Sequence, residues 1–273
     1  MEMSGYGDTR ETIVIVGGGI CGLLPLPLAL HRKGIKSLVL ERSKTLRATG
    51  VAIVVHPNGW RALDHLGVGS YLRQTAIPVL SGQLTSLDND KVDELPIGKE
   101  ELRCVKRMDM INILAHNLPP NTVCFGCDVL SIELDPITSS PVLQLQDGTT
   151  LKAKAVIGCD GVNSTITNLI GLKATNVFNV CAVRGTTTYP SAHKFGSDFK
   201  LIKTSDGLFG IIPMTTNRLY WFITARYISQ DSKICKCQNL ILNYALEWVK
   251  DFPSSIKEMV KKCSLESLHF LSA

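Results

Sequence analysis

A glycine-rich stretch near the start of the chain constrains the fold more than any other feature. Residues 13–16 (IVIV) are a short apolar run typical of a buried parallel strand, and Gly17, Gly19 and Gly22 follow at G-x-G-x-x-G spacing. This pattern predicts a strand, a tight turn and a helix whose first amide groups hold a pyrophosphate. Glu41 ends the next expected strand, 19 residues after Gly22, where a carboxylate accepts the hydroxyls of an adenosine ribose. The two features together predict an FAD- or NAD-binding fold.

Two prolines interrupt the helix that this pattern requires. Pro25 and Pro27 follow the last glycine closely, and each interior proline costs a helix roughly 3 kcal/mol relative to alanine. The amide groups that hold phosphate precede Pro25, so they can persist as an isolated turn. We therefore expect the helix to break after that turn and to restart near Pro27, where proline at a first helical position is tolerated.

Composition excludes several classes of protein. The 273 residues are 45% hydrophobic with a net charge of +5, which suits one large core or two lobes and excludes a disordered chain. The basic residues are scattered, so neither nucleic-acid nor membrane binding is expected. The uncharged residues 13–30 contain three consecutive glycines and two prolines, which argues against a membrane span.

The cysteines indicate free thiols. Their number is nine, and the opening residues MEMSGYGDTRE do not resemble a secretory leader, so we expect a reducing, cytoplasmic location. Cys124 and Cys127 form a C-x-x-C with no second pair to complete a knuckle, so no metal site is predicted.

The order of expected elements indicates a mixed α/β fold. Helices are expected near residues 58–67 and 107–118, a hairpin at 81–95, and a second hairpin that turns at Asp147-Gly148 before another buried strand and a short helix near Asn163. From about residue 176 the pattern becomes a series of strands, which predicts an antiparallel sheet. The tail from about Gln238 predicts two helices separated by Pro253.

Three further motifs carry a family resemblance. LERSKTLRATG (40–50) places Arg42, Arg47 and Gly50 directly after the expected ribose acid, and VKRMDMINIL (105–114) places Arg107 at the start of an expected helix. AVIGCDGVNS (155–164) puts Asp160-Gly161 at the carboxyl end of a strand. With these motifs, nearly the whole chain resembles the FAD-dependent aromatic hydroxylases of the p-hydroxybenzoate hydroxylase type. The similarity is greatest to the plant salicylate-hydroxylase-like monooxygenases. The resemblance implies a Rossmann-like FAD-binding domain with an inserted and following antiparallel substrate-side sheet.

The resemblance also implies roles for individual residues. The glycines allow the backbone of Ile20 and Cys21 to approach the FAD pyrophosphate. The residues expected to bind cofactor are Gly17, Gly19, Ile20, Cys21, Gly22, Glu41, Arg42, Arg47, Gly50, Arg107, Asp160 and Gly161. Members of the family reduce FAD with NADH or NADPH and insert one oxygen atom of O₂ into an aromatic or related small molecule. Because the flavin carries the chemistry, no catalytic acid or base is predicted, and His193 and Tyr189 are interpreted as packed or surface residues.

The family's third fingerprint, a Gly-Asp beyond the substrate sheet, is absent, so the resemblance implies a C-terminally truncated member. The expected FAD-binding portion has two parts, residues 1–75 and 101–175, with a β-rich substrate-side insertion at 76–100 between them. The substrate sheet is expected at 176–237 and the terminal helices at 238–273. Three hypotheses follow: a flavin monooxygenase, a non-catalytic remnant with weak or no FAD binding, and an NAD-dependent reductase. The third leaves Asp160-Gly161 and the late sheet unexplained.

Overall fold

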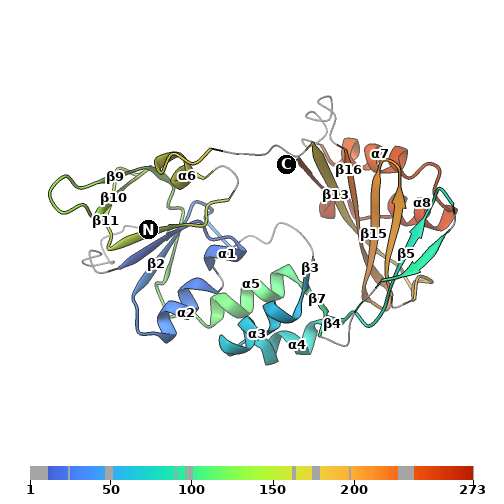
Figure 1. Cartoon of the computed structure of the whole chain (residues 1–273), viewed down its shortest axis with the longest axis horizontal. Coiled ribbons are helices and arrows are strands. Elements are labelled where there is room, and N and C mark those ends of the chain that lie inside the picture. Colours follow the sequence, from blue (N-terminus) through green and yellow to red (C-terminus); the bar gives the residue numbers. More distant parts are fainter. Residues whose placement is uncertain are drawn as a thin grey trace. The chain divides into compact units, whose positions relative to one another are not determined.

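The computed structural model describes residues 12–23, 25–46, 52–89, 91–95, 97, 101–161, 164–173, 179–196, 198–226 and 237–272. Contacts within the chain divide it into two compact units (Figure 1). The first comprises residues 1–48, 61–72 and 108–175, and the second comprises residues 49–60, 73–107 and 176–273. The boundaries expected between cofactor-binding and substrate-side portions stay a prediction.

A parallel four-stranded sheet forms the centre of the first unit. Its order is β12 (Ala155–Gly158), β1 (Ile13–Val16), β2 (Ser37–Glu41) and β8 (Val123–Phe125). The β1 strand pairs with a neighbour on each side, and its Val14 and Ile15 are fully buried. A parallel strand covered on both faces needs apolar side chains on both, which explains the IVIV run. The expected parallel strand before the glycines is therefore confirmed.

Antiparallel strands cover one face of this sheet. They are β9 (Val129–Leu134), β10 (Pro141–Leu145) and β11 (Thr150–Lys152). Leu143 and Leu145 of β10 share a buried cluster with Val14 and Leu38 of the parallel sheet. The hairpin between β10 and β11 turns at Asp147-Gly148 as expected, because Gly148 adopts a φ of +85° there. The short helix expected near residue 163 is α6 (Thr165–Leu169), capped by the Ser164 side chain.

The helix after the glycine turn is broken, as the prolines predict. The chain forms α1 (Ile20–Leu23), and then restarts as α2 (Leu26–Arg32) with Pro25 at its N-cap. The first hydrogen bond of the second helix runs from the amide of Ala29 to the carbonyl of Pro25. Proline is tolerated at such positions because the first amides of a helix have no partner within it. The restart lies one residue before the expected Pro27.

Replacing both prolines should join these two helices. We expect Pro25→Ala with Pro27→Ala to raise the melting temperature by about 2–4 °C, or about 1 kcal/mol. Restored amides then bond to the carbonyls of the preceding turn, a gain partly offset by a more flexible unfolded chain. The measurement is thermal unfolding by circular dichroism. Pro253→Ala, at the exposed N-cap of the separate helix α8 (Ser254–Lys261), is the control and should give no rise. An unchanged or lower melting temperature for the double variant would show that the residues packed around α1 and α2 favour the break between these helices.

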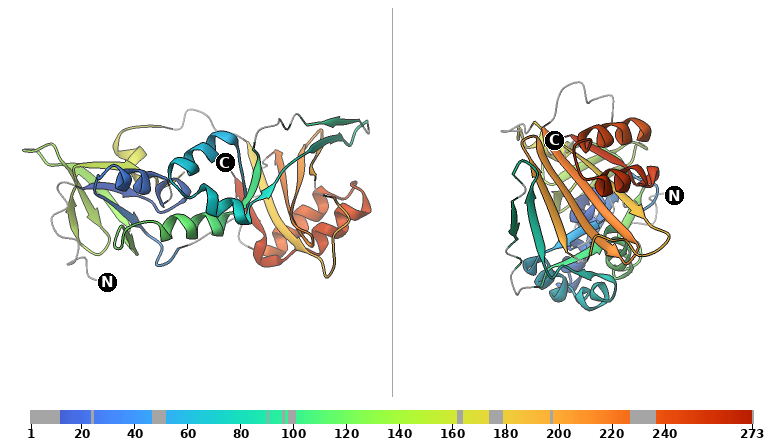
Figure 2. Two further views of the ribbon diagram at one scale, coloured as in Figure 1. Left: turned by 90° about the horizontal axis from the view of Figure 1, so that it is seen from below. Right: turned by 90° about the vertical axis from the view of Figure 1, so that its right-hand side faces the viewer.

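The second unit is built on a seven-stranded sheet (Figure 2). Its order is β17 (His269–Ser272), β13 (Val180–Thr188), β16 (Arg218–Arg226), β15 (Gly207–Thr215), β14 (Phe199–Thr204), β5 (Gly82–Ser86) and β6 (Val92–Glu94). The antiparallel sheet expected after residue 176 and the hairpin expected at 81–95 are both confirmed. The pairing of β17 with β13, and the parallel pairing of β5 with β14, were not expected.

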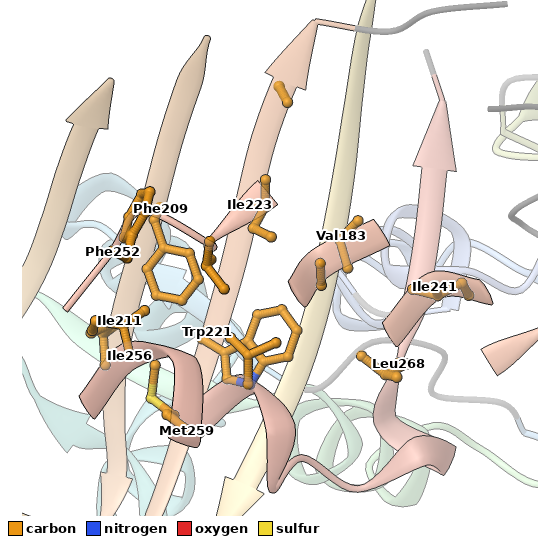
Figure 3. Packing of buried hydrophobic residues seen from close by; sticks show 14 of the residues in the cluster. Val183, Phe209, Ile211, Trp221, Ile223, Ile241, Phe252, Ile256, Met259 and Leu268 are labelled. Atoms are coloured by element: carbon orange, nitrogen blue, oxygen red, sulfur yellow. The ribbon is translucent and has the colours of Figure 1, made fainter. Parts of the chain in front are cut away.

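Two helices cover one face of this sheet. They are α7 (Gln238–Trp248) and α8, the two helices expected around Pro253. Alternate residues of the strands, including Val183, Phe209 and Trp221, pack against Ile256 and Met259 (Figure 3). Part of the other face packs against a small antiparallel sheet of order β3 (Ala52–Val55), β7 (Arg103–Lys106) and β4 (Ile77–Pro78).

The remaining helices lie where the boundaries between the units fall. They are α3 (Pro57–His65), α4 (Gly69–Thr75) and α5 (Arg107–His116), and a 3₁₀ turn (Leu265–Ser267) precedes β17. The α3 and α5 helices were expected, whereas α4 was not. Among the described residues, no helix is both long enough and apolar enough to cross a bilayer.

An ion-pair cluster ties α4 to the small sheet. Arg73 donates two hydrogen bonds of 2.8 Å to the two carboxylate oxygens of Glu101, and Arg103 Nε donates a third at 2.6 Å. The hydrogen bonds from Arg73 are the main cause of a lowered pKa for the Glu101 carboxyl. A lowered pKa in the folded state means that the ionised carboxylate stabilises the fold above the ordinary pKa, and that this stabilisation is lost as the pH falls through the folded-state value.

We therefore expect Glu101→Gln to lower the free energy of unfolding by about 1 kcal/mol at pH 7 and by much less at pH 3. Urea unfolding at both pH values measures the difference. The control is Glu94→Gln, at an exposed position on β6, which should have little effect at either pH. An equal loss at the two pH values would mean that the carboxylate charge contributes nothing.

Candidate functional site

The turn between β1 and α1 requires glycine at two positions. Gly17 adopts a φ of +100°, and a Cβ atom there would collide with the backbone carbonyl of Cys159 at the end of β12. A Cβ atom at Gly22 would collide with the carbonyl oxygen of Gly17. The amide of Gly17 donates to the carbonyl of Leu40 at 2.8 Å, which connects the turn to the end of β2. The glycines thus allow a helix and two strand ends to meet closely.

Gly19 has a different environment from its neighbours. It is exposed, and a Cβ atom built on it would have no other atom within 4 Å. A side chain there would therefore extend into open space at the mouth of the turn rather than into the protein. This open approach is what a ligand needs if it is to reach the backbone amides of the turn.

Glu41 points into the mouth of the turn. Its Oε2 accepts a hydrogen bond from the amide of Gly18 at 2.6 Å, and its Oε1 accepts one from the amide of Ser43 at 2.7 Å. A Cβ atom at Gly18 would press on the Glu41 side chain. Glu41 therefore joins the turn to the end of β2, a role that its spacing alone did not indicate. The ribose-binding role of Glu41 stays a prediction.

Asp160 and Gly161 lie beside the same turn, directly after β12. The amide of Cys159 bonds to the carbonyl of Val16 at 2.7 Å, which places Asp160 next to Gly17. Asp160 Oδ2 accepts from the amide of Thr165 at 2.7 Å, at the start of α6. Its Oδ1 is buried and has no hydrogen-bond partner among the residues that the structure describes. A buried acceptor without a donor is costly, and it marks a position that a ligand hydroxyl or amide can satisfy.

The structure relates the other expected cofactor residues less directly to the glycine turn. Ile20 and Cys21 begin α1, so their backbone lies in the turn as expected, and Arg42 is exposed directly after Glu41. Arg47 and Gly50 lie outside the described residues. Arg107 is the first residue of α5 and belongs to the second unit, whereas the glycine turn belongs to the first.

The two residues interpreted as packed are found in a turn of the second unit. The His193 ring packs edge-on against the rings of Tyr189 and Phe195, and its Nε2 lies 3.0 Å from the carbonyl of Thr215. A carbonyl only accepts, so Nε2 is the protonated nitrogen in the neutral ring. Burial raises the pKa of Tyr189. The packed interpretation is consistent with these contacts.

Three residues of the site were missed from the sequence. Gly18, Ser43 and Cys159 each contribute a backbone group or a close contact. For Gly18 the sequence did carry a signal, because the G-x-G spacing requires glycine only at 17 and 19, yet position 18 is also glycine. Ser43 and Cys159 act through backbone atoms, which residue type does not reveal. Cys124 and Cys127 are buried thiols, and burial is the main cause of a pKa of about 12 for Cys127, which makes this thiol a poor nucleophile.

A family model described as an FAD binding domain matches residues 10–243. The chain belongs to this family. Family membership decides between the two cofactor expectations in favour of FAD. The chain is 42% identical over 257 residues to Monooxygenase 1 of Arabidopsis thaliana, covering 94% of this chain and 64% of that protein. It is 36% identical over 272 residues to Monooxygenase 2 of the same plant, covering 98% and 65%. The chain thus spans slightly less than two thirds of the length of these relatives.

Solved structures agree on the fold of this family member. Klebsiella pneumoniae HpxO, complexed with FAD and uric acid, superposes with a TM-score of 0.81 at 17% identity, covering 96% of this chain and 67% of that one. The 2,6-dihydroxypyridine-3-hydroxylase of Arthrobacter nicotinovorans gives a TM-score of 0.78 at 20% identity, covering 97% and 72%. The expected mixed α/β class, with a parallel cofactor sheet and an antiparallel sheet, is confirmed.

The residues around the turn fit the dinucleotide part of FAD. Gly19 leaves open space next to the backbone amides, as the pyrophosphate requires. The Glu41 carboxylate lies at the mouth of the same turn, and Asp160 Oδ1 is a buried acceptor that lacks a donor among the described residues. No group of three or more metal-ligating side chains gathers anywhere in the described part of the chain.

Proposed function

We propose that this chain binds FAD through the glycine turn and forms the cofactor-binding and substrate-side parts of a flavin-dependent monooxygenase. The activity is the hydroxylation of an aromatic or related small molecule with O₂ and NADH or NADPH. The observation that carries the proposal is the turn itself, where Gly17 and Gly22 are required by close packing and Gly19 is open to a ligand. The relatives named as monooxygenases support the reaction class.

Each residue of the site has a proposed role. The amides from Gly19 to Gly22 bind the pyrophosphate, and the Glu41 carboxylate binds the ribose hydroxyls and repels a 2′-phosphate. Asp160 Oδ1 accepts a hydroxyl or amide proton of the cofactor, while its Oδ2 fixes the start of α6. Arg42, Arg47 and Arg107 supply positive charge for the pyrophosphate. FAD, when bound, supplies the electron transfer from NAD(P)H to O₂ on which hydroxylation depends, and the protein orients substrate and cofactor.

Cofactor loading and turnover test the proposal separately. We expect the purified chain to be yellow, or to become yellow after FAD is added and the excess is removed, with a flavin absorption band. We also expect an aromatic substrate to stimulate NAD(P)H oxidation. A preparation that stays colourless after added FAD contradicts the proposal. A yellow protein that oxidises no NAD(P)H with any aromatic compound contradicts the proposed activity but not FAD binding. A colourless one agrees with the second hypothesis, a non-catalytic remnant with weak or no FAD binding.

The length of the relatives supports retaining the second hypothesis, a non-catalytic remnant. About a third of the length of Monooxygenase 1 and of Monooxygenase 2 lies outside the part that this chain matches. A sample of this chain mixed with the unmatched part of Monooxygenase 1 tests whether that part restores turnover. The cytoplasmic location stays a prediction.

A further inference from the structure

A short irregular loop follows β2 at the same edge of the parallel sheet as the glycine turn. Its residues 42–46 (RSKTL) form neither helix nor strand, and β1 and β2 run in parallel, so both strands end at this edge. The Ser43 amide donates to Glu41 Oε1 at 2.7 Å, and the Ser43 carbonyl accepts from the amide of Gly126 at 2.9 Å. The first part of the loop is therefore fixed at the ends of β2 and β8.

Thr45 is an accessible hydroxyl in this loop. It lies two residues beyond Ser43, it is exposed, and its hydroxyl makes no hydrogen bond with any residue that the structure describes. A protein kinase needs such an acceptor, because the segment that carries the hydroxyl has to enter the cleft of the enzyme without breaking a helix or a strand ladder. The loop meets this requirement at Thr45.

Two basic side chains precede Thr45 in the loop. Arg42 lies three residues before it and Lys44 one residue before it, and both are exposed. Neither forms an ion pair or a side-chain hydrogen bond within the described part of the chain. Basophilic protein kinases select basic residues before the acceptor, because carboxylates in their clefts form ion pairs with guanidinium and ammonium groups. Arg42 and Lys44 are free to make those contacts.

A phosphate on Thr45 would lie close to the glycine turn. Glu41 Oε2 accepts a hydrogen bond of 2.6 Å from the amide of Gly18, so the end of β2 contacts the turn. Thr45 is four residues beyond Glu41, and a segment of that length spans at most about 14 Å. Charges in water interact over about 10 Å at 0.1 M ionic strength and over about 30 Å at 0.01 M. A phosphate at Thr45 therefore acts on an anion bound at the turn.

The phosphate would oppose binding of a pyrophosphate in two ways. It carries a charge of about −1.5 to −2 at pH 7 and repels a second anion directly. Its oxygens also accept charge-assisted hydrogen bonds from a guanidinium group, and Arg42 is close enough along the loop to donate them. The positive charge of Arg42 would then be neutralised by the phosphate instead of attracting the cofactor.

We propose that Thr45 is a phosphorylation site for a basophilic protein kinase, and that its phosphate weakens FAD binding at the glycine turn. In the transfer, Thr45 Oγ1 forms a bond to the γ-phosphorus of ATP and the bond between that phosphorus and the β-phosphate oxygen breaks. ADP leaves, and the proton of the hydroxyl passes through the kinase to solvent. The effect on FAD rests on the proposed function, whereas the acceptor role of Thr45 does not.

The first test is phosphoryl transfer to the full chain. The chain is incubated with ATP and a calcium/calmodulin-dependent protein kinase, a class that selects arginine three residues before its acceptor, and peptide mass spectrometry locates the phosphate. We expect phosphate on Thr45, and a rate at that residue at least about 10-fold lower in Arg42→Gln, which lacks the ion pair with the kinase. An unmodified Thr45, or an equal rate in Arg42→Gln, would overturn the acceptor role.

The second test is the affinity for FAD, measured by quenching of flavin fluorescence. We expect the chain phosphorylated at Thr45 to bind FAD about 10-fold more weakly than the unmodified chain at 0.01 M ionic strength. At 1 M salt, where charges interact over only about 3 Å, the difference should fall below about 3-fold. Thr45→Glu should weaken FAD binding about 3- to 5-fold at low salt, and the neutral Thr45→Gln should stay within about 1.5-fold.

Thr138→Glu is the matched control, since it adds the same charge elsewhere in the first unit. Thr138 is exposed in the turn between β9 and β10, and the six residues of β9 separate it from the end of β8 by about 20 Å. It should leave FAD binding within about 1.5-fold at low salt, and a loss equal to that of Thr45→Glu would overturn a local effect of Thr45.

Two further results decide the regulatory part. Unchanged FAD affinity after phosphorylation of Thr45 would overturn it, and so would a loss that persists in full at 1 M salt, because that loss would not be electrostatic. Failure of the proposed function is a separate result: the unmodified chain would then bind no FAD, while mass spectrometry would still report whether Thr45 accepts phosphate.

Discussion

Gly22→Ala is expected to lower the free energy of unfolding by about 2–3 kcal/mol and to abolish FAD binding. A methyl group there would occupy the position of the Gly17 carbonyl oxygen and press on Cys159. Both contacts belong to the backbone or its immediate neighbours, so the strain cannot be relieved by rotating a flexible side chain. The turn must open, and the amides that it presents would no longer converge. Urea unfolding and FAD absorbance after gel filtration measure the two effects.

Gly19→Ala is the matched control for this prediction. A methyl group at Gly19 meets no atom within 4 Å, so the variant should unfold at nearly the same denaturant concentration as the unchanged protein. It should nevertheless bind FAD more weakly, because its methyl group extends toward the space assigned to the pyrophosphate. Equal stability losses in both variants would show that the turn is not packed as described. Full FAD binding by Gly19→Ala would place the pyrophosphate elsewhere.

Trp221→Ala is expected to lower the free energy of unfolding by about 3–5 kcal/mol, the usual range for removing a buried tryptophan. Trp221 is fully buried on the helix-covered face, and its ring is stacked on Phe209 with 6.0 Å between centroids (Figure 3). Its Nε1 donates to Thr187 Oγ1 at 3.2 Å, and that hydroxyl donates to the carbonyl of Met259 at 2.7 Å in α8. The substitution thus leaves a cavity and removes a donor from a buried hydroxyl.

Trp221→Phe separates these two contributions. It retains most of the ring contact with Phe209 but loses the donor to Thr187, so we expect a loss of about 1–2 kcal/mol. Chemical unfolding followed by circular dichroism measures both variants. A loss below about 1 kcal/mol for Trp221→Ala would mean that the sheet and its helices repack around the vacancy.

Local patterns in the sequence were sufficient for many elements. The IVIV run, the glycine spacing, the Asp147-Gly148 turn and the prolines each act over a few residues, and each produced the expected strand, turn or break. Strand pairings between segments far apart in the sequence could not be predicted from such local patterns. The β5 strand pairs in parallel with β14, more than 100 residues away, and nothing in either strand specifies its partner.

The sequence by itself determined that a strand, a glycine turn and a broken helix begin this chain, and that an acid follows at the end of the next strand. These features depend on backbone torsions and side-chain periodicity, which short segments control on their own. Only the tertiary structure decided that Glu41 accepts a hydrogen bond from the amide of Gly18, and that the backbone of Cys159 leaves no room for a side chain at Gly17. Each depends on which distant segments meet, and that is settled by the burial of whole strands and helices rather than by any one residue.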